Sequence, residues 1–173
     1  MLTLTGPDRI GFVEEMTGLL LARGGNVETS RMARLGGEFA ILMLVSMPSE
    51  EFPRLEKDLE TLAARGYKLT LTPARHTYAE GHAGWLPHKI EVRGADHEGI
   101  IHEVARYLSK HGINIEAADS ESTPAPTSGA PLFAMSARVI VPPGLSDQSW
   151  VAGLEDIGDR MNCDITVSAL QDQ

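Results

Sequence analysis

Hydrophobic and charged or polar residues alternate at two places far apart in the chain, and each place predicts a short β-strand. Leu2 and Leu4 alternate with threonines at the start of the chain, whereas Ile90 and Val92 alternate with charged residues near its middle. After each of these segments, apolar residues recur at helical spacing. They are Val13, Met16 and Leu20 in the first case and Ile101, Val104 and Leu108 in the second. We therefore expect each strand to lead into a helix with one buried side.

Two further strands are expected after each helix. In the first half of the chain, Gly36 and Gly37 predict a tight hairpin that leads into the apolar run 39–47. We expect this strand to be buried on both faces, because it lacks alternation. In the second half, a polar segment with two prolines, residues 122–129, precedes the apolar run 132–141, and its composition predicts a loop.

A second helical stripe and a last strand close each half. The stripes consist of Phe52, Leu55, Leu59 and Leu62 in the first half and of Trp150, Leu154 and Ile157 in the second. Alternation at 67–72 and 164–169 predicts the last strands. Each half thus has the order strand, helix, strand, strand, helix, strand. We expect a first domain at 1–74, a linker at 75–87 and a second domain at 88–173.

The two halves are copies of one unit, because a shift of 88 residues brings identical residues into register. The identical pairs are Gly6 and Gly94, Asp8 and Asp96, Gly11 and Gly99, Glu15 and Glu103, Leu20 and Leu108, Gly24 and Gly112, Asn26 and Asn114, and Glu28 and Glu116. Glycines, an asparagine and acidic residues recur, so the match concerns turns as well as the hydrophobic pattern. We infer an internal duplication.

The order of elements predicts the α+β class, with two ferredoxin-like βαββαβ domains in tandem. In this arrangement two helices cover one face of a four-stranded antiparallel sheet. Each sheet has unpaired edge strands, which attract other strands. We therefore predict that the two sheets lie side by side, and we keep homo-oligomer formation as a further hypothesis.

Composition narrows the classes of function. The chain has 173 residues and a formal net charge of -9, which opposes phosphate backbones and argues against direct nucleic-acid binding. Cys163 is the only cysteine, which fits a reducing compartment. The apolar run 39–45 is far shorter than the roughly 20 residues that a membrane helix needs. We expect a cytoplasmic protein without membrane contact.

The two turns between the first strand and the first helix of each copy are candidate sites for a small ligand. The candidate residues are Asp8, Arg9, Ile10, Gly11 and Asn26 in the first copy and Asp96, Gly99 and Asn114 in the second. Free N–H groups at a helix start attract a carboxylate, a glycine allows a ligand to approach the backbone, and an asparagine offers both a donor and an acceptor. The alternative is that the aspartates only cap the helices and the asparagines only turn the chain.

These turns resemble the ACT domain, a regulatory module that binds amino acids. Residues 6–11 with 13–15 and 24–27 carry the resemblance in the first copy, and residues 94–99 with 103–105 and 111–115 carry it in the second. The resemblance therefore spans nearly the whole chain. Many family members have a proline before the turn glycine. This chain has Ile10 and Glu98 there, and the Glu98 carboxylate would occupy the place of a ligand carboxylate.

A more particular stretch, residues 30–39, is similar to tandem-ACT proteins of the glycine cleavage system transcriptional repressor type. This resemblance implies a non-catalytic cytoplasmic regulator with glycine as its effector. It also implies contact with a transcription activator protein rather than with DNA. The alternative is an amino-acid-sensing regulatory subunit of a metabolic enzyme, since ACT domains also accompany such enzymes.

The spacing of reactive residues argues against catalysis and against a cofactor. His97 and His102 are five residues apart, whereas the histidines of a zinc-protease helix are four apart and share one face. Residues 6–11 have the glycine separation of a P-loop but no following Lys-Ser or Lys-Thr. No Gly-x-Ser-x-Gly motif is present for a nucleophilic serine. We therefore expect neither a metal site nor an enzyme.

Overall fold

The structure is a computed structural model that describes residues 1–74, 82–145 and 149–170. The chain divides into two compact units, Met1–Thr77 and Tyr78–Gln173. Residues 75–81, which belong to the predicted linker, lie outside the described residues. Each unit is considered by itself below, and the side-by-side arrangement of the sheets stays a prediction.

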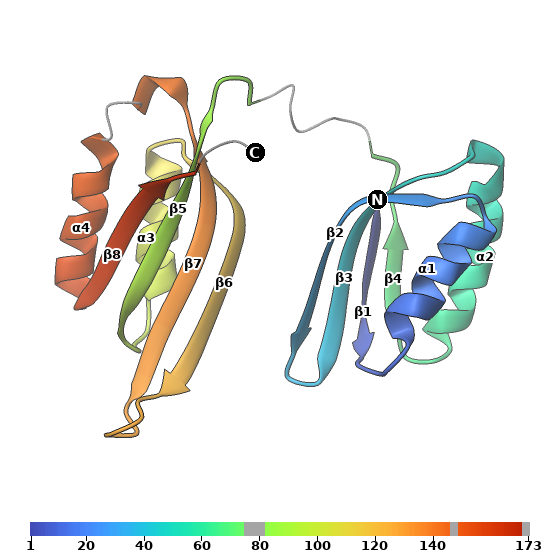
Figure 1. Cartoon of the computed structure of the whole chain (residues 1–173), viewed down its shortest axis with the longest axis horizontal. Helices are drawn as coiled ribbons and strands as arrows, with labels where there is room; N and C mark the ends of the chain where they lie inside the picture. Colours follow the sequence, from blue (N-terminus) through green and yellow to red (C-terminus); the bar gives the residue numbers. More distant parts are fainter. Residues whose placement is uncertain (75–81, 146–148, 171–173) are drawn as a thin grey trace. The chain divides into compact units, whose positions relative to one another are not determined.

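The first unit contains one antiparallel sheet with two helices on one of its faces (Figure 1). Its elements are β1 (Leu2–Pro7), α1 (Phe12–Ala22), β2 (Asn26–Leu35), β3 (Glu38–Ser46), α2 (Phe52–Ala63) and β4 (Lys68–Leu71). The strands lie in the order β2-β3-β1-β4, so that β1 is central and β2 is an edge.

The second unit repeats this architecture (Figure 1). Its elements are β5 (Leu86–Ala95), α3 (Ile100–Lys110), β6 (Asn114–Pro124), β7 (Pro131–Val141), α4 (Ser149–Met161) and β8 (Cys163–Ala169). The strand order β6-β7-β5-β8 matches that of the first sheet. The predicted α+β class and the duplicated βαββαβ unit are thus confirmed. Among the described residues, no helix is long and apolar enough to cross a membrane.

The helices α1 and α3 bury a slightly different side from the one predicted. Val13 and Ile101, which we expected in the core, are 38% and 50% exposed, whereas Phe12 and Ile100 are buried. Each helix begins one residue after a glycine with positive φ, and this turn directs the first helical side chain into the core. The other expected core residues of these helices, such as Met16 and Val104, are buried as predicted.

The expectation that β3 is buried on both faces is wrong. Ile41 and Met43 are buried, but the intervening Leu42 and Leu44 are 43% and 37% exposed. The reason is that helices cover only one face of the sheet, so successive side chains of the strand alternate between core and surface.

The two hairpins differ in length and in turn chemistry. Gly36 and Gly37 have φ of 58° and 90° and form the predicted two-residue turn between β2 and β3. In the second unit, β6 continues to Pro124, so part of the expected loop 122–129 is strand. Ser122 faces Phe133 across the ladder, and the remaining turn is closed by a 2.7 Å hydrogen bond from the Ala125 N–H to the Ala130 carbonyl. Cross-strand pairing outweighs the polar composition here.

The strand β5 begins at Leu86, inside the segment that we assigned to the linker. Pro87 lacks an N–H donor, but its carbonyl accepts a hydrogen bond of 2.9 Å from the Leu170 N–H. A proline is compatible with a strand where only its carbonyl needs a partner. The second domain therefore extends at least two residues further toward the N-terminus than predicted.

A strand glycine lets the last strand of each unit pass close to the first. A Cβ atom built on Gly6 would lie within 2.3 Å of the Tyr67 ring. A Cβ atom on Gly94 would lie 2.6 Å from the Cys163 sulfur and 2.8 Å from the Asn162 carbonyl oxygen. These glycines are identical in the two copies because only hydrogen fits at this crossing.

We predict that Gly94→Ala destabilises the second unit by about 2 kcal/mol or more, because backbone atoms of Asn162 and Cys163 cannot move aside easily. Gly18→Ala is the matched control. It lies in α1 with no atom within 4 Å of the built Cβ, so we expect a gain of about 0.5–1 kcal/mol from helix propensity. Urea unfolding of both variants measures the difference, and equal stabilities would contradict the close-approach argument.

Candidate functional site

The turn between the first strand and the first helix has the same backbone shape in both units. Gly11 has φ of 82° and Gly99 has φ of 94°, and each immediately precedes its helix. Neither helix start has a hydrogen bond from a capping side chain. The N–H groups of the first helical turn thus have no side-chain acceptor at the cap, which is the arrangement that binds a small anion.

Asp8 and Asp96 do not cap these helices, contrary to the alternative kept open above. The cap position is taken by a glycine, three residues further along the chain, and no side chain makes a capping hydrogen bond there. Instead, the Asp8 N–H donates to the Gly37 carbonyl at 3.1 Å, and the Asp96 N–H donates to the Pro131 carbonyl at 3.0 Å. Both aspartates therefore fasten the turn to the neighbouring hairpin through their backbone.

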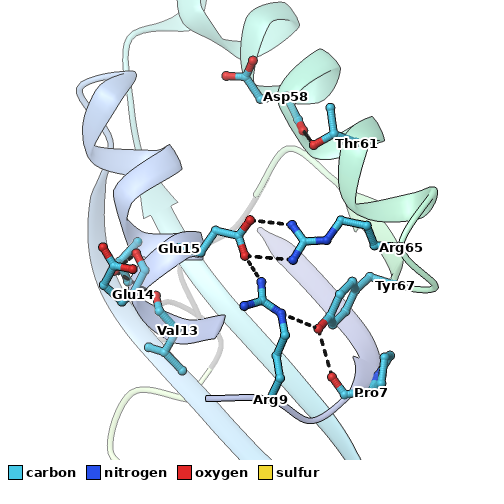
Figure 2. Close-up of polar contacts among 10 residues, drawn as sticks. Pro7, Arg9, Val13, Glu14, Glu15, Asp58, Thr61, Arg65 and Tyr67 are labelled. Carbon is cyan, nitrogen blue, oxygen red and sulfur yellow. Dashed lines mark hydrogen bonds and ion pairs between the residues drawn. The ribbon is translucent and has the colours of Figure 1, made fainter. Parts of the chain in front are cut away.

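Arg9 lies beside the helix start of the first unit, where it joins a polar cluster (Figure 2). Its Nε donates to the Tyr67 hydroxyl at 3.2 Å, and this hydroxyl donates to the Pro7 carbonyl at 3.0 Å. The guanidinium also lies 5.2 Å from the ring centre of Phe12, within range of a cation–π interaction. Phe12 in turn stacks on Tyr67 with a centroid distance of 4.3 Å.

Glu15 is shared by two guanidinium groups (Figure 2). One carboxylate oxygen pairs with Arg9, and Arg65 reaches the other oxygen at 2.5 Å. All three side chains are partly exposed, at 33–44% of their surface. Arg9, Glu15 and Arg65 together thus carry one net positive charge. Glu14 in the same helical turn is a second carboxylate near the helix start, and Asp8 pairs with Arg34 at 3.8 Å.

Sequence reasoning named Arg9 but missed Arg65 and Tyr67. These two residues follow α2, more than fifty positions from Arg9, so no local pattern connects them. The available signal was Gly6, since a glycine in a strand interior indicates a close neighbour. Tyr67 is that neighbour.

The second unit carries different chemistry at the matching positions. His97 stands where the first copy has Arg9, and its two ring nitrogens lie 2.7 Å from the Met161 carbonyl oxygen and 3.1 Å from the Glu98 carbonyl oxygen. Glu103, the counterpart of Glu15, pairs with Arg106 on its own helix at 2.6 Å, and this hydrogen bond lowers the pKa of the Glu103 carboxyl. In the first unit, Glu15 connects the start of α1 to the segment after α2 through Arg9 and Arg65. Among the described residues of the second unit, no comparable ion-pair chain connects the start of α3 to the segment after α4.

Carbonyl contacts at both ring nitrogens favour the protonated form of His97. A neutral imidazole has one N–H, whereas the imidazolium has two donors. The hydrogen bond to Met161, and to a lesser extent that to Glu98, raises the pKa of His97 above its ordinary value.

The residue before the turn glycine is exposed in both units. Ile10 is fully exposed, which is unusual for a large apolar side chain, and Glu98 at the matching position is exposed as well. Each side chain therefore stands in solvent at the mouth of the helix start.

Asn26 and Asn114 lie away from these turns. Asn26 begins β2 and pairs with Ser46, at the open end of the β2–β3 hairpin. The turn that contains Gly11 is instead bonded to Gly37, in the loop at the other end of this hairpin. Asn26 donates to the Glu28 carboxylate at 3.1 Å. The register places Asn114 in the same way, opposite Ile140. The structure thus brings Asp8, Arg9, Ile10 and Gly11 together, and separately Asp96 and Gly99, but it does not bring either asparagine to its turn.

We predict that Glu15→Gln lowers the free energy of unfolding by about 0.5–1 kcal/mol in low salt, because it leaves Arg9 and Arg65 without their shared anion. The loss should shrink in 1 M salt, where exposed charges are screened. Glu103→Gln is the matched control. Its partner is three residues away on the same helix, so we expect a smaller loss. Urea unfolding at two salt concentrations measures both, and an equal loss in the two variants would contradict a bridging role for Glu15.

We predict that His97 stabilises the second unit more at low than at high pH. Because the folded-state pKa is raised, the contribution is fully present below the unfolded value of about 6.5 and is lost as the pH rises through the folded value. The difference in stability between the original chain and His97→Gln should therefore fall between pH 5.5 and 8.5. An NMR titration that places the imidazole pKa at or below that of an unstructured peptide would overturn this prediction.

A family model and several known proteins match this chain. The model of the ACT domain matches residues 1–69, which make up most of the first unit. The glycine cleavage system transcriptional repressor of Escherichia coli (strain K12) is 30% identical over 131 residues, which cover 72% of this chain and 65% of the relative. The match therefore spans slightly less than two thirds of that protein.

Two solved structures resemble the whole chain. A protein of unknown function from Galdieria sulphuraria is 33% identical, with a TM-score of 0.85, over 98% of this chain and 96% of that one. A protein named as a candidate glycine cleavage system transcriptional repressor is 18% identical with a TM-score of 0.69 over 99% of this chain and 96% of that one, and it supports the fold alone. Residues 1–69 thus match the ACT domain, the second unit repeats the same strand order, and the chain is similar in sequence to a glycine cleavage system transcriptional repressor.

Proposed function

We propose that this chain is a non-catalytic regulatory protein that senses a small, glycine-like amino acid and controls transcription through contact with another protein. The observation that carries the proposal is the helix start behind Gly11, which lacks a capping side chain and lies beside a cationic cluster. The similarity to a transcriptional repressor of the glycine cleavage system supports the regulatory role.

The first unit offers the better match to an amino-acid carboxylate. The N–H groups of α1 and the helix dipole favour an anion at this point. Arg9 adds a fixed positive charge, and its partner Glu15 is itself shared with Arg65. A ligand carboxylate would therefore meet both backbone donors and a cation whose charge is only partly neutralised.

The second unit is the weaker candidate. Glu98 places a carboxylate in the residue that precedes the turn glycine, where it competes with a ligand carboxylate for the same helix start. His97 contributes positive charge only when protonated, whereas Arg9 is charged at every physiological pH. We propose that the first unit binds the effector and that the second has a different or lost ligand preference.

Contact with a protein rather than with DNA agrees with the charge of the chain. A net charge of -9 repels a phosphate backbone, whereas it attracts a basic protein surface. The proposed partner is a transcription activator. Affinity capture with the whole chain tests this point, and recovery of a metabolic enzyme that responds to an amino acid would replace it with the regulatory-subunit alternative.

Isothermal titration calorimetry against glycine, serine and the remaining amino acids tests the sensing role. We expect one small amino acid to bind, and we expect Ile10→Glu to weaken binding at least tenfold, because the new carboxylate competes at the helix start of the first unit. Glu98→Ile is the matched control, since it makes the reverse change in the second unit and should leave the first site intact. No measurable binding of any amino acid, or equal effects of the two substitutions on binding, would refute the proposal.

A further inference from the structure

The first unit contains a cavity of about 460 Å³ at the end of its core. Its walls are mostly apolar and come from five elements or their flanks, with Leu2, Leu20, Val45, Phe52, Leu55 and Leu71 as the main contributors. Cavities of about 300–1,000 Å³ with apolar walls are typical of sites for small molecules. Neither the fold nor the proposed function assigns an occupant to this space.

The cavity is remote from the turn that contains Gly11. Leu2 begins β1 and pairs with Met43, whereas Pro7 ends β1 and pairs with Glu38 next to the glycine hairpin. Leu2 lines the cavity, which therefore lies at the start of β1, whereas the turn follows Pro7 at the end of this strand. A ligand in the cavity would therefore lie away from Arg9 and the Gly11 turn, whereas Asn26, which the structure separates from that turn, pairs with the cavity-lining Ser46.

The duplicated unit indicates what chemistry this space accepts. The buried residues of α2 are Leu55, Leu59 and Leu62, and those of α4 follow the same spacing as Trp150, Leu154 and Ile157. Trp150 thus stands where the first copy has Leu55. Its indole ring is 1% exposed, so it fills the corresponding end of the second core.

The ring of His88 packs against Trp150 at the same end of the second core. The His88 ring lies 5.6 Å from the Trp150 ring at an angle of 85°, and only 5% of His88 is exposed. The sheet register supports the comparison. Leu2 pairs with Met43 in the first sheet, and the equivalent pair in the second sheet is Ile90 with Ala137. Two residues further along β3 and β7, the cavity-lining Val45 is equivalent to Val139. Val139 pairs with His88. The comparison between the copies rests on Trp150, because its counterpart Leu55 has the smaller side chain and lines the open cavity.

We propose that the cavity of the first unit binds a small neutral molecule with a flat aromatic ring. Two carboxylates and one cation lie around the rim, because the Ser46 hydroxyl donates to Glu28, the Ser49 hydroxyl donates to Glu50, and the lining Met1 ammonium donates to the Thr72 carbonyl, so negative charge is in excess. These two carboxylates repel a negative ligand, whereas a neutral ring loses only its contact with water on entering. The proposal is independent of the amino-acid site.

Indole is the probe for the experiment, with indole-3-acetate as its anionic counterpart. We expect indole at ten times its dissociation constant to raise the melting temperature by about 4 °C or more, as ligand linkage predicts for a unit of this size. Backbone amide shifts in an NMR titration should concentrate at Leu2, Val45, Phe52 and Leu71. Indole-3-acetate should bind at least tenfold more weakly.

Leu55→Trp is the decisive variant, because it places in the first unit the indole ring that Trp150 places at the matching position of the second unit. It should abolish the indole response, and Leu21→Trp, the same change at an exposed position of α1, should preserve it. No response to indole, an equal response in Leu55→Trp, or amide shifts centred on the Gly11 turn would each overturn the proposal. Should Leu55→Trp fail to fold, the pattern of amide shifts in the original chain decides the question. Failure of amino-acid binding leaves this result unaffected, so the two proposals are tested separately.

Discussion

The left-handed glycine at the start of α1 and α3 is the constraint on which each unit depends. Gly11 and Gly99 adopt positive φ, a conformation that other residues rarely accept. The turn directs the next side chain, Phe12 or Ile100, into the core, and it places a glycine rather than an aspartate at the cap position. One backbone conformation thus fixes the packing of the helix and at the same time leaves its first N–H groups without a side-chain acceptor.

This shared backbone carries different charges in the two copies. Arg9 and Arg65 are permanent cations that meet at Glu15 and connect the helix start to the segment after α2. His97 instead contacts the main chain at Met161, so that its interaction depends on protonation. The two copies therefore share the glycines of the turn, while the side chains around the open helix start carry a fixed charge in the first copy and a titrating one in the second.

The order of the elements could be predicted from the sequence because it follows from local periodicity, as at Leu55, Leu59 and Leu62. The details that could not be predicted depend on tertiary structure. The burial of Phe12 rather than Val13 follows from a backbone angle that no hydrophobic pattern encodes. The cluster around Arg9 needs Arg65 from a distant segment. Asn26 and Gly11 both recur in the second copy, yet Asn26 begins the ten-residue strand β2, and the Gly11 turn is bonded beyond the other end of this strand.

The helix α1 connects the two proposed sites of the first unit. It begins directly after Gly11 at the amino-acid site, and Leu20 near its other end lines the apolar cavity. A packed helix moves as a rigid body, so a ligand that displaces α1 at one end also changes the geometry at the other. By linkage, any such coupling acts equally in both directions on the two affinities. In the second unit the buried Trp150, packed edge-to-face against His88, stands at the position of Leu55, so the two copies differ at this end of the core.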